Sequence, residues 1–89
     1  MSSKSGRLTL DEAAAYRICV QGHLNPDRSD YLQGMKIEVV TAENGYPRSV
    51  LCGILADQAA LAGVLTCLYD WGLPLLSVEY VNGEHKTRD

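Results

Sequence analysis

The side chains best suited to chemistry lie in one short loop, which contains His23, Asp27 and Asp30. Imidazole and carboxylate groups can hold a metal ion or act as an acid and base pair. The same loop is rich in Asn, Pro, Asp and Ser, which favour turns for conformational reasons alone, and its spacing matches no recognised metal motif. We therefore expect no metal ion, no cofactor and no catalytic residue, and we keep a small metal-dependent enzyme using this loop as an alternative.

Four other residues are candidates for binding a ligand. Asp57 and Gln58 precede a predicted helix, whose first amides could bind an anion or a polar group. The simpler interpretation is that Asp57 caps the helix and Gln58 bonds to a neighbouring loop. Arg17 and Gln21 lie on the outward face of a predicted strand. That face mixes apolar and polar residues, which suits a partner or a small ligand.

The three cysteines, Cys19, Cys52 and Cys67, all lie in apolar stretches. An odd number without a CxxC pair argues against a disulfide framework and against a structural zinc site. We expect them to be small residues of the core or of an interface. The sequence also lacks a nucleophile elbow, a Walker loop, a dinucleotide fingerprint and an HExxH helix. A non-enzymatic protein is therefore favoured.

The clearest element is a helix that starts after Asp57 and ends near Trp71. Gly72 suits a left-handed position after the last turn, and Pro74 prevents continuation. Residues at helical spacing form a broad apolar face, in which Leu65 should lie in the central core. This face consists of Ala60, Leu61, Val64, Leu65, Leu68 and Trp71. The opposite side is small or polar and consists of Ala59, Gly63, Thr66 and Asp70.

Four segments have the composition of strands, namely 16–24, 35–43, 48–56 and 75–81. In the first of them Tyr16, Ile18 and Val20 alternate with polar residues, so one face should be buried. Between the first two strands, Asp27 or Ser29 could cap a short helical turn. Between the second and third, Asn44-Gly45 predicts a type I′ hairpin turn.

This order predicts an α+β fold of ferredoxin-like β(α)ββαβ type. It would have a four-stranded, mainly antiparallel sheet, one main helix and a first helix reduced to a turn. The third and fourth strands should be parallel to each other. We expect one domain over 8–81, a disordered segment over 1–7 and a flexible polar tail over 82–89. Within 8–15, Thr9 and Glu12 have the spacing of a capping box.

Several runs resemble a family of short, uncharacterised bacterial proteins. The resemblance rests on the pattern G-x-L-x-DQAAL-x-GVL, which starts at Gly53, and on LYD-x-GLPLLSVE, which starts at Leu68. It extends over about 16–79. The resemblance implies a compact fold, and it implies no activity, substrate or cofactor.

Size and charge restrict the remaining classes of function. A chain of 89 residues supports one core. A net charge of −3 with scattered basic residues gives no reason to expect nucleic acid. No apolar run approaches the roughly 20 residues that span a bilayer, and no signal-peptide region precedes the domain, so we expect a cytoplasmic protein that does not bind membranes.

One helix is too narrow to cover the apolar face of four strands, so a second molecule should cover the rest. We therefore expect a non-enzymatic interaction or scaffold module that forms a homodimer or a higher homo-oligomer, with a protein partner also possible. The alternative is a regulatory domain that binds a small molecule at a dimer interface.

Overall fold

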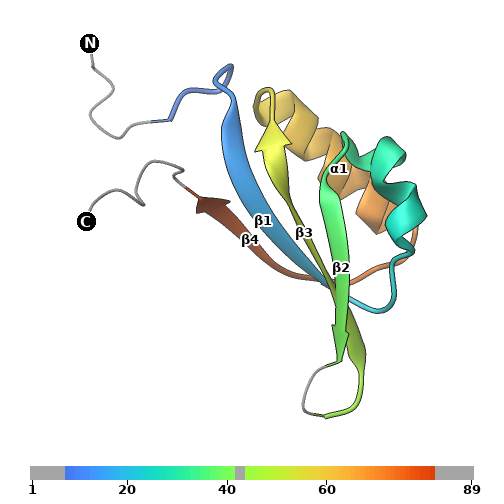
Figure 1. Cartoon of the computed structure of the whole chain (residues 1–89). Coiled ribbons are helices and arrows are strands. Elements are labelled where there is room, and N and C mark those ends of the chain that lie inside the picture. The colour runs from blue at the N-terminus through green and yellow to red at the C-terminus, as the bar shows by residue number, and fades with distance from the viewer. Residues whose placement is uncertain (1–7, 42–43, 82–89) are drawn as a thin grey trace.

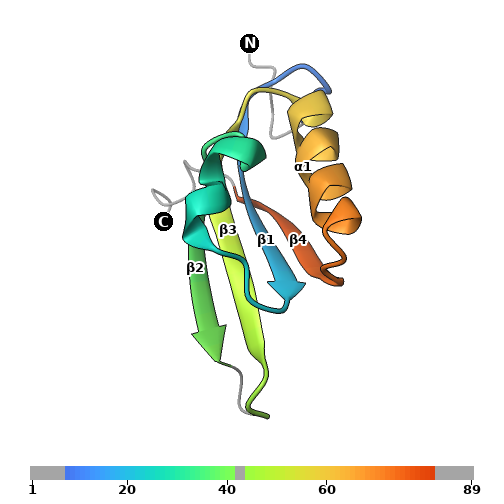
Figure 2. The same cartoon turned by 90° about the vertical axis from the view of Figure 1, so that its right-hand side faces the viewer.

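The computed structural model describes residues 8–41 and 44–81, which form an open four-stranded sheet with two helices on one of its faces (Figures 1 and 2). The elements follow in the order β1 (Ala14–Gln21), η1 (Pro26–Leu32), β2 (Lys36–Thr41), β3 (Pro47–Leu55), α1 (Gln58–Asp70) and β4 (Leu75–Val81). The α+β class and the single main helix are confirmed, and η1 is a 3-10 helix in place of a full first helix. The segment predicted to be disordered, 1–7, and the predicted flexible tail, 82–89, lie outside the described residues.

The sheet has the strand order β2-β3-β1-β4. All neighbouring strands are antiparallel. Because β3 and β4 both run antiparallel to β1, they are parallel to each other, as predicted. The first strand lies inside the sheet, and the last strand forms one of its edges.

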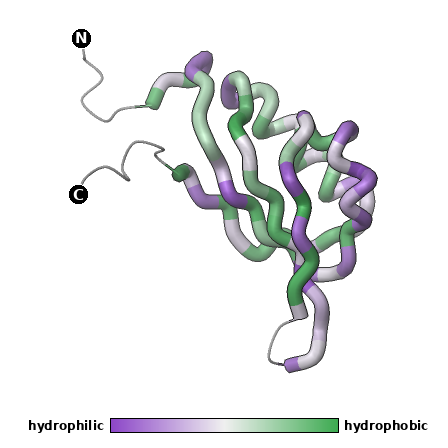
Figure 3. The backbone as a smooth tube through the Cα atoms, viewed as in Figure 1, coloured by the Kyte–Doolittle hydropathy of each residue, from purple (hydrophilic) through white to green (hydrophobic). Residues whose placement is uncertain are grey.

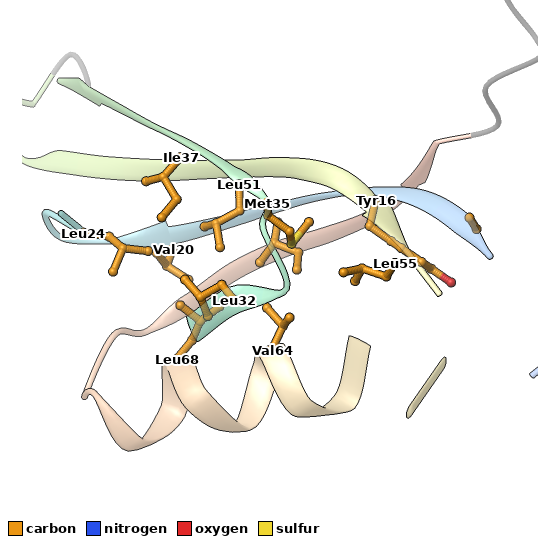
Figure 4. Close-up of a cluster of buried hydrophobic side chains, with 12 residues drawn as sticks. Tyr16, Val20, Leu24, Leu32, Met35, Ile37, Leu51, Leu55, Val64 and Leu68 are labelled. Atoms are coloured by element: carbon orange, nitrogen blue, oxygen red, sulfur yellow. The ribbon is translucent and has the colours of Figure 1, made fainter. Parts of the chain in front are cut away.

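Apolar residues alternate with polar ones along the strands, most visibly in β2 (Figure 3). In β1 the residues Tyr16, Ile18 and Val20 are buried, which confirms the predicted face. These residues meet Leu32 from η1 and Leu68 from α1 in one core beneath the sheet (Figure 4). The core therefore joins both helices to the two central strands.

Helix α1 begins and ends where the sequence predicted. Asp57 caps it, with Oδ1 accepting a hydrogen bond of 2.8 Å from the amide of Ala60. The chain leaves the helix at Gly72, whose φ of 76° is costly for any residue with a Cβ. The predicted apolar face is only partly correct, because Val64 and Leu68 are buried whereas Leu65 is partly exposed. The helix packs chiefly against η1 and β3, which leaves Leu65 at the margin of the core.

Two local predictions were wrong in detail. The cap of η1 is Asn25, not Asp27 or Ser29, because its Oδ1 accepts from the amide of Asp27 at 2.9 Å and Pro26 occupies the first turn. The hairpin between β2 and β3 is not a two-residue type I′ loop, since the last strand pair is Thr41 with Pro47. Five residues separate this pair in the sequence, which is more than the two of a type I′ loop.

The segment before β1 contains a turn and no helix. The carboxylate of Glu12 accepts from the amide of Thr9 at 3.1 Å, which is one half of a capping box. The spacing therefore produced the expected contact. Ala14 and Ala15 already belong to β1, so the strand begins two residues earlier than predicted.

Candidate functional site

The least protected part of the described structure is the edge strand β4. Leu75, Val78 and Tyr80 lie opposite the core residues Val20, Ile18 and Tyr16 of β1, and opposed residues share a face of the sheet. They nevertheless remain 51%, 39% and 46% exposed. The side of β4 that faces the helices is therefore apolar and largely uncovered.

The exposed surface continues from β4 onto α1. Leu65, Tyr69 and Leu75 belong to the lining of an apolar hollow of about 190 Å³ between the end of the helix and the start of the strand. Tyr69 is 80% exposed at its rim. We call β4 together with this hollow the β4 surface. An exposed apolar patch of this kind is characteristic of an interaction site.

An irregularity makes β4 apolar on its other face as well. The register with β1 shifts between Cys19 and Val20, which leaves Leu76 as an extra residue in β4. Leu76 is 49% exposed and lies beside Gln21 and Arg48, which are on the face of the sheet without helices. The start of β4 therefore presents leucines to both sides.

Charge does little to protect this edge. The only charged residue of β4 is Glu79, which forms an ion pair of 2.9 Å with Arg17 on β1. A hydrogen bond with Cys52 and the nearby charge of Glu79 raise the pKa of the Arg17 guanidinium. By contrast, the opposite edge strand β2 carries Lys36 and Glu38, and charged residues discourage pairing between edges.

The four candidate ligand residues do not form one site. Asp57 and Gln58 lie at the start of α1, where Asp57 caps the helix and the amide group of Gln58 donates to the hydroxyl of Tyr16. Arg17 and Gln21 lie on the face of β1 without helices, and Arg17 is paired with Glu79. Ligand binding by these residues remains a prediction, and three of them, Asp57, Gln58 and Arg17, already have structural partners.

The loop with His23, Asp27 and Asp30 does not concentrate its titratable groups. Within 8–41 and 44–81, no three His, Cys, Asp or Glu side chains come together in a way that could hold a metal ion. His23 instead lines a hollow beside Arg28 and Trp71. The metal-dependent alternative thus has no geometric support in this loop.

The three cysteines are free thiols, of which Cys19 and Cys67 are partly buried and Cys52 is exposed. Cys67 packs against the core from α1, in agreement with the expectation. Cys52 is exposed opposite Arg17 on the face without helices, so it is not a core residue. Its position there follows from the alternation of β3, in which Leu51 points into the core.

Comparison with known proteins places the chain in a family. A family model described as a domain of unknown function (DUF8691) matches residues 15–79, and the chain belongs to this family. No curated protein matches the chain. No solved structure matches it either. In the described part of the chain, no helix has the length and apolar character needed to cross a membrane.

The sequence pointed to an uncovered sheet face but not to its location. Val78 and Tyr80 were predicted to lie in a strand, and nothing in the sequence marks that strand as an edge. Only the pairing of β4 with β1, between segments far apart in the sequence, places them beyond the helix. A short, apolar last strand is a weak signal of this arrangement.

Proposed function

We propose that this protein is a non-enzymatic module that associates with itself through the β4 surface. The observation that carries the proposal is an edge strand with exposed apolar side chains on both faces. An edge of this kind is a template for pairing with another strand, and natural monomers usually block it with charges, prolines or a covering segment.

A second copy of the same chain is the occupant that fits best. Two β4 strands related by a two-fold axis would pair antiparallel, so each surface meets an identical one. Pairing centred on Val78 would place Glu79 opposite Ser77 and avoid a contact between like charges. The contact would also bring the exposed residues beside β4, such as Tyr69, toward the partner.

The strand order supports a finer description of the fold. Read from the other edge as β4-β1-β3-β2, with β1 and β2 flanking β3 and the main helix between β3 and β4, it fits the ferredoxin-like arrangement with its first helix shortened. We propose this classification. We further propose that the protein is a scaffold subunit, because the exposed surface is suited to association. Bacterial origin and a cytoplasmic location are proposals that rest on the sequence alone.

Sedimentation analysis at micromolar concentration tests the proposal. The wild-type protein should sediment as a homodimer or a higher homo-oligomer. Val78→Lys should shift it to a monomer, because a charge at the centre of the interface would be buried without a partner. Val78 is partly exposed in one chain, so the variant should still fold.

Ile54→Lys is the matched control. Ile54 lies on β3, where it pairs with β1 and not with β4, and it is 72% exposed. This variant should sediment like the wild type. A monomeric wild type, or an equal loss of association in both variants, contradicts the proposal.

A further inference from the structure

A second hollow lies on the other side of α1, where the end of the helix meets the loop after β1. Its volume is about 270 Å³, and it is lined by His23, Leu24, Asn25, Arg28, Trp71 and Leu73. The backbone of Gly22 packs closely against the side chain of Leu73, because a Cβ at Gly22 would lie 3.1 Å from Cδ2 of Leu73. The φ of Gly22 is 109°, which also favours glycine. None of the residues that line it belongs to β4, and it shares only Leu73 with the hollow of the β4 surface.

The cationic group of this hollow is held in place by two aromatic rings. Cζ of Arg28 lies 5.1 Å from the ring centre of Trp71 and 6.0 Å from that of Tyr31. The two rings are themselves packed edge to face, 6.2 Å apart. Contacts between a cation and ring faces restrict the guanidinium while its N–H edge can still donate.

Arg28 has no acidic partner in the described part of the chain. The ion pair found there joins Arg17 to Glu79, although Asp27 and Asp30 are close to Arg28 along η1. None of the residues that line the hollow is acidic. An ordered guanidinium without a carboxylate, in a concave site, is suited to bind an external anion.

The other lining groups indicate what kind of anion would fit. Asn25 uses its Oδ1 to accept from the amide of Asp27, so its amide NH₂ group is the part that can donate to a ligand. Leu24, Leu73 and the Trp71 ring add apolar surface. A ligand with one planar anionic end and a small apolar body would complement both parts.

We propose that this hollow binds a small organic carboxylate. The carboxylate would accept two parallel hydrogen bonds from the guanidinium of Arg28, and the apolar body would pack against Trp71 and Leu73. A phosphate group is tetrahedral and strongly hydrated, and it would leave the apolar wall unused. The site therefore favours a carboxylate with a hydrocarbon body over inorganic phosphate.

Fluorescence titration of the full chain tests this proposal, because Trp71 is the one tryptophan of the sequence. At constant ionic strength, cyclohexanecarboxylate should change the Trp71 emission and reach saturation. The neutral cyclohexanecarboxamide and inorganic phosphate should not reach saturation over the same range. Saturation with the carboxamide, or with phosphate alone, overturns the proposed ligand class.

Variants identify the residue responsible. Arg28→Ala should weaken binding of cyclohexanecarboxylate about tenfold or more, and Arg28→Lys should fall between it and the wild type because it keeps the charge but not the planar fork. Lys36→Ala changes the net charge equally from an exposed position on β2 and should leave binding unchanged. Unaltered binding in Arg28→Ala overturns the proposal. If Arg28→Ala does not fold, unaltered binding in Arg28→Lys also overturns it.

Discussion

The hydroxyl of Tyr16 links the central strand to the main helix. Its ring is 4% exposed, and its oxygen accepts a hydrogen bond from the amide group of Gln58 at the start of α1. Burial raises the pKa of this phenol above its ordinary value of 10.0, with further contributions in the same direction from Tyr80 and Glu12. The hydrogen bond from Gln58 acts in the opposite direction and is outweighed.

This raised pKa predicts a loss of stability at alkaline pH. Below pH 10 both the folded and the unfolded chain keep the phenol proton, so Tyr16 adds no pH dependence. Above it the unfolded chain releases the proton first, and the free energy of unfolding falls as pH rises through the folded pKa. Urea unfolding measured from neutral pH to above pH 10 should show a steeper loss at the alkaline end in the wild type than in Tyr16→Phe.

Tyr46→Phe provides the control for this prediction. The other four tyrosines, Tyr31, Tyr46, Tyr69 and Tyr80, are exposed. Tyr46→Phe should therefore follow the wild-type profile. Parallel profiles for wild type and Tyr16→Phe would show that the hydroxyl of Tyr16 is not the group responsible. At neutral pH the Phe variant should lose about 1 kcal/mol with the Gln58 bond.

At the scale of single elements, only Val64 and Leu68 of α1 are buried. Leu68 is buried and Leu65, three residues earlier, is partly exposed, although both line the apolar hollow next to β4. Truncating an enclosed leucine removes its contacts and leaves a cavity, while a partly exposed leucine has fewer contacts to lose. The two positions therefore differ in how much buried contact a truncation to alanine removes.

Leu68→Ala should lower the free energy of unfolding by about 2 to 5 kcal/mol, and Leu65→Ala by clearly less. Asp70→Ala, on the exposed side, should stay within about 0.5 kcal/mol of the wild type. Chemical denaturation at the lowest practical concentration measures these values without a contribution from association. Equal costs at Leu65 and Leu68 would mean that α1 is rotated relative to the described orientation.

Local signals explain which elements could be predicted from the sequence. The limits of α1 and the start of β4 were predicted correctly because they depend on neighbouring residues in the sequence. These residues are Asp57, Gly72 and Pro74. The cap of η1 was missed because Asn25, Asp27 and Ser29 all have suitable side chains, and the choice depends on Pro26 following Asn25.

Features that depend on contacts distant in sequence could not be predicted. The orientation of α1 depends on the position of Leu32 from η1, so the burial of Leu65 was misjudged. The hollow around Arg28 joins η1 to the end of α1, and no local pattern connects Arg28 with Trp71. The candidate ligand residues were chosen on local grounds, and the structure places them on opposite faces of the sheet.

At the scale of the whole molecule, the two sheet edges are unequal. The β2 edge carries charged residues and contacts η1, whereas β4 carries exposed leucine, valine and tyrosine. If two chains pair through β4, the outward backbone amides of that strand become hydrogen-bonded only in the dimer. The backbone amides of the two edge strands should then differ in how their protection from hydrogen exchange depends on protein concentration.

Hydrogen exchange measured at two protein concentrations checks this expectation. Amides of β4 should exchange more slowly at the higher concentration, and amides of β2 should exchange at the same rate in both samples. The comparison uses the unmodified chain, so it is independent of any variant. Protection of β4 that does not depend on concentration would contradict pairing through this edge.

The central position of β1 also affects how the chain acquires its structure during synthesis. Both strands that flank β1 follow it in the sequence, and its ion pair with Glu79 joins residues 62 positions apart. A nascent chain that has left the ribosome only as far as α1 exposes β1 along one whole side. Until Leu75 to Val81 emerge, β1 lacks the strand that pairs with it along this side, so Ile18 and its neighbours are more exposed than in the folded protein. During this interval the chain is most susceptible to misassembly and to binding by a chaperone.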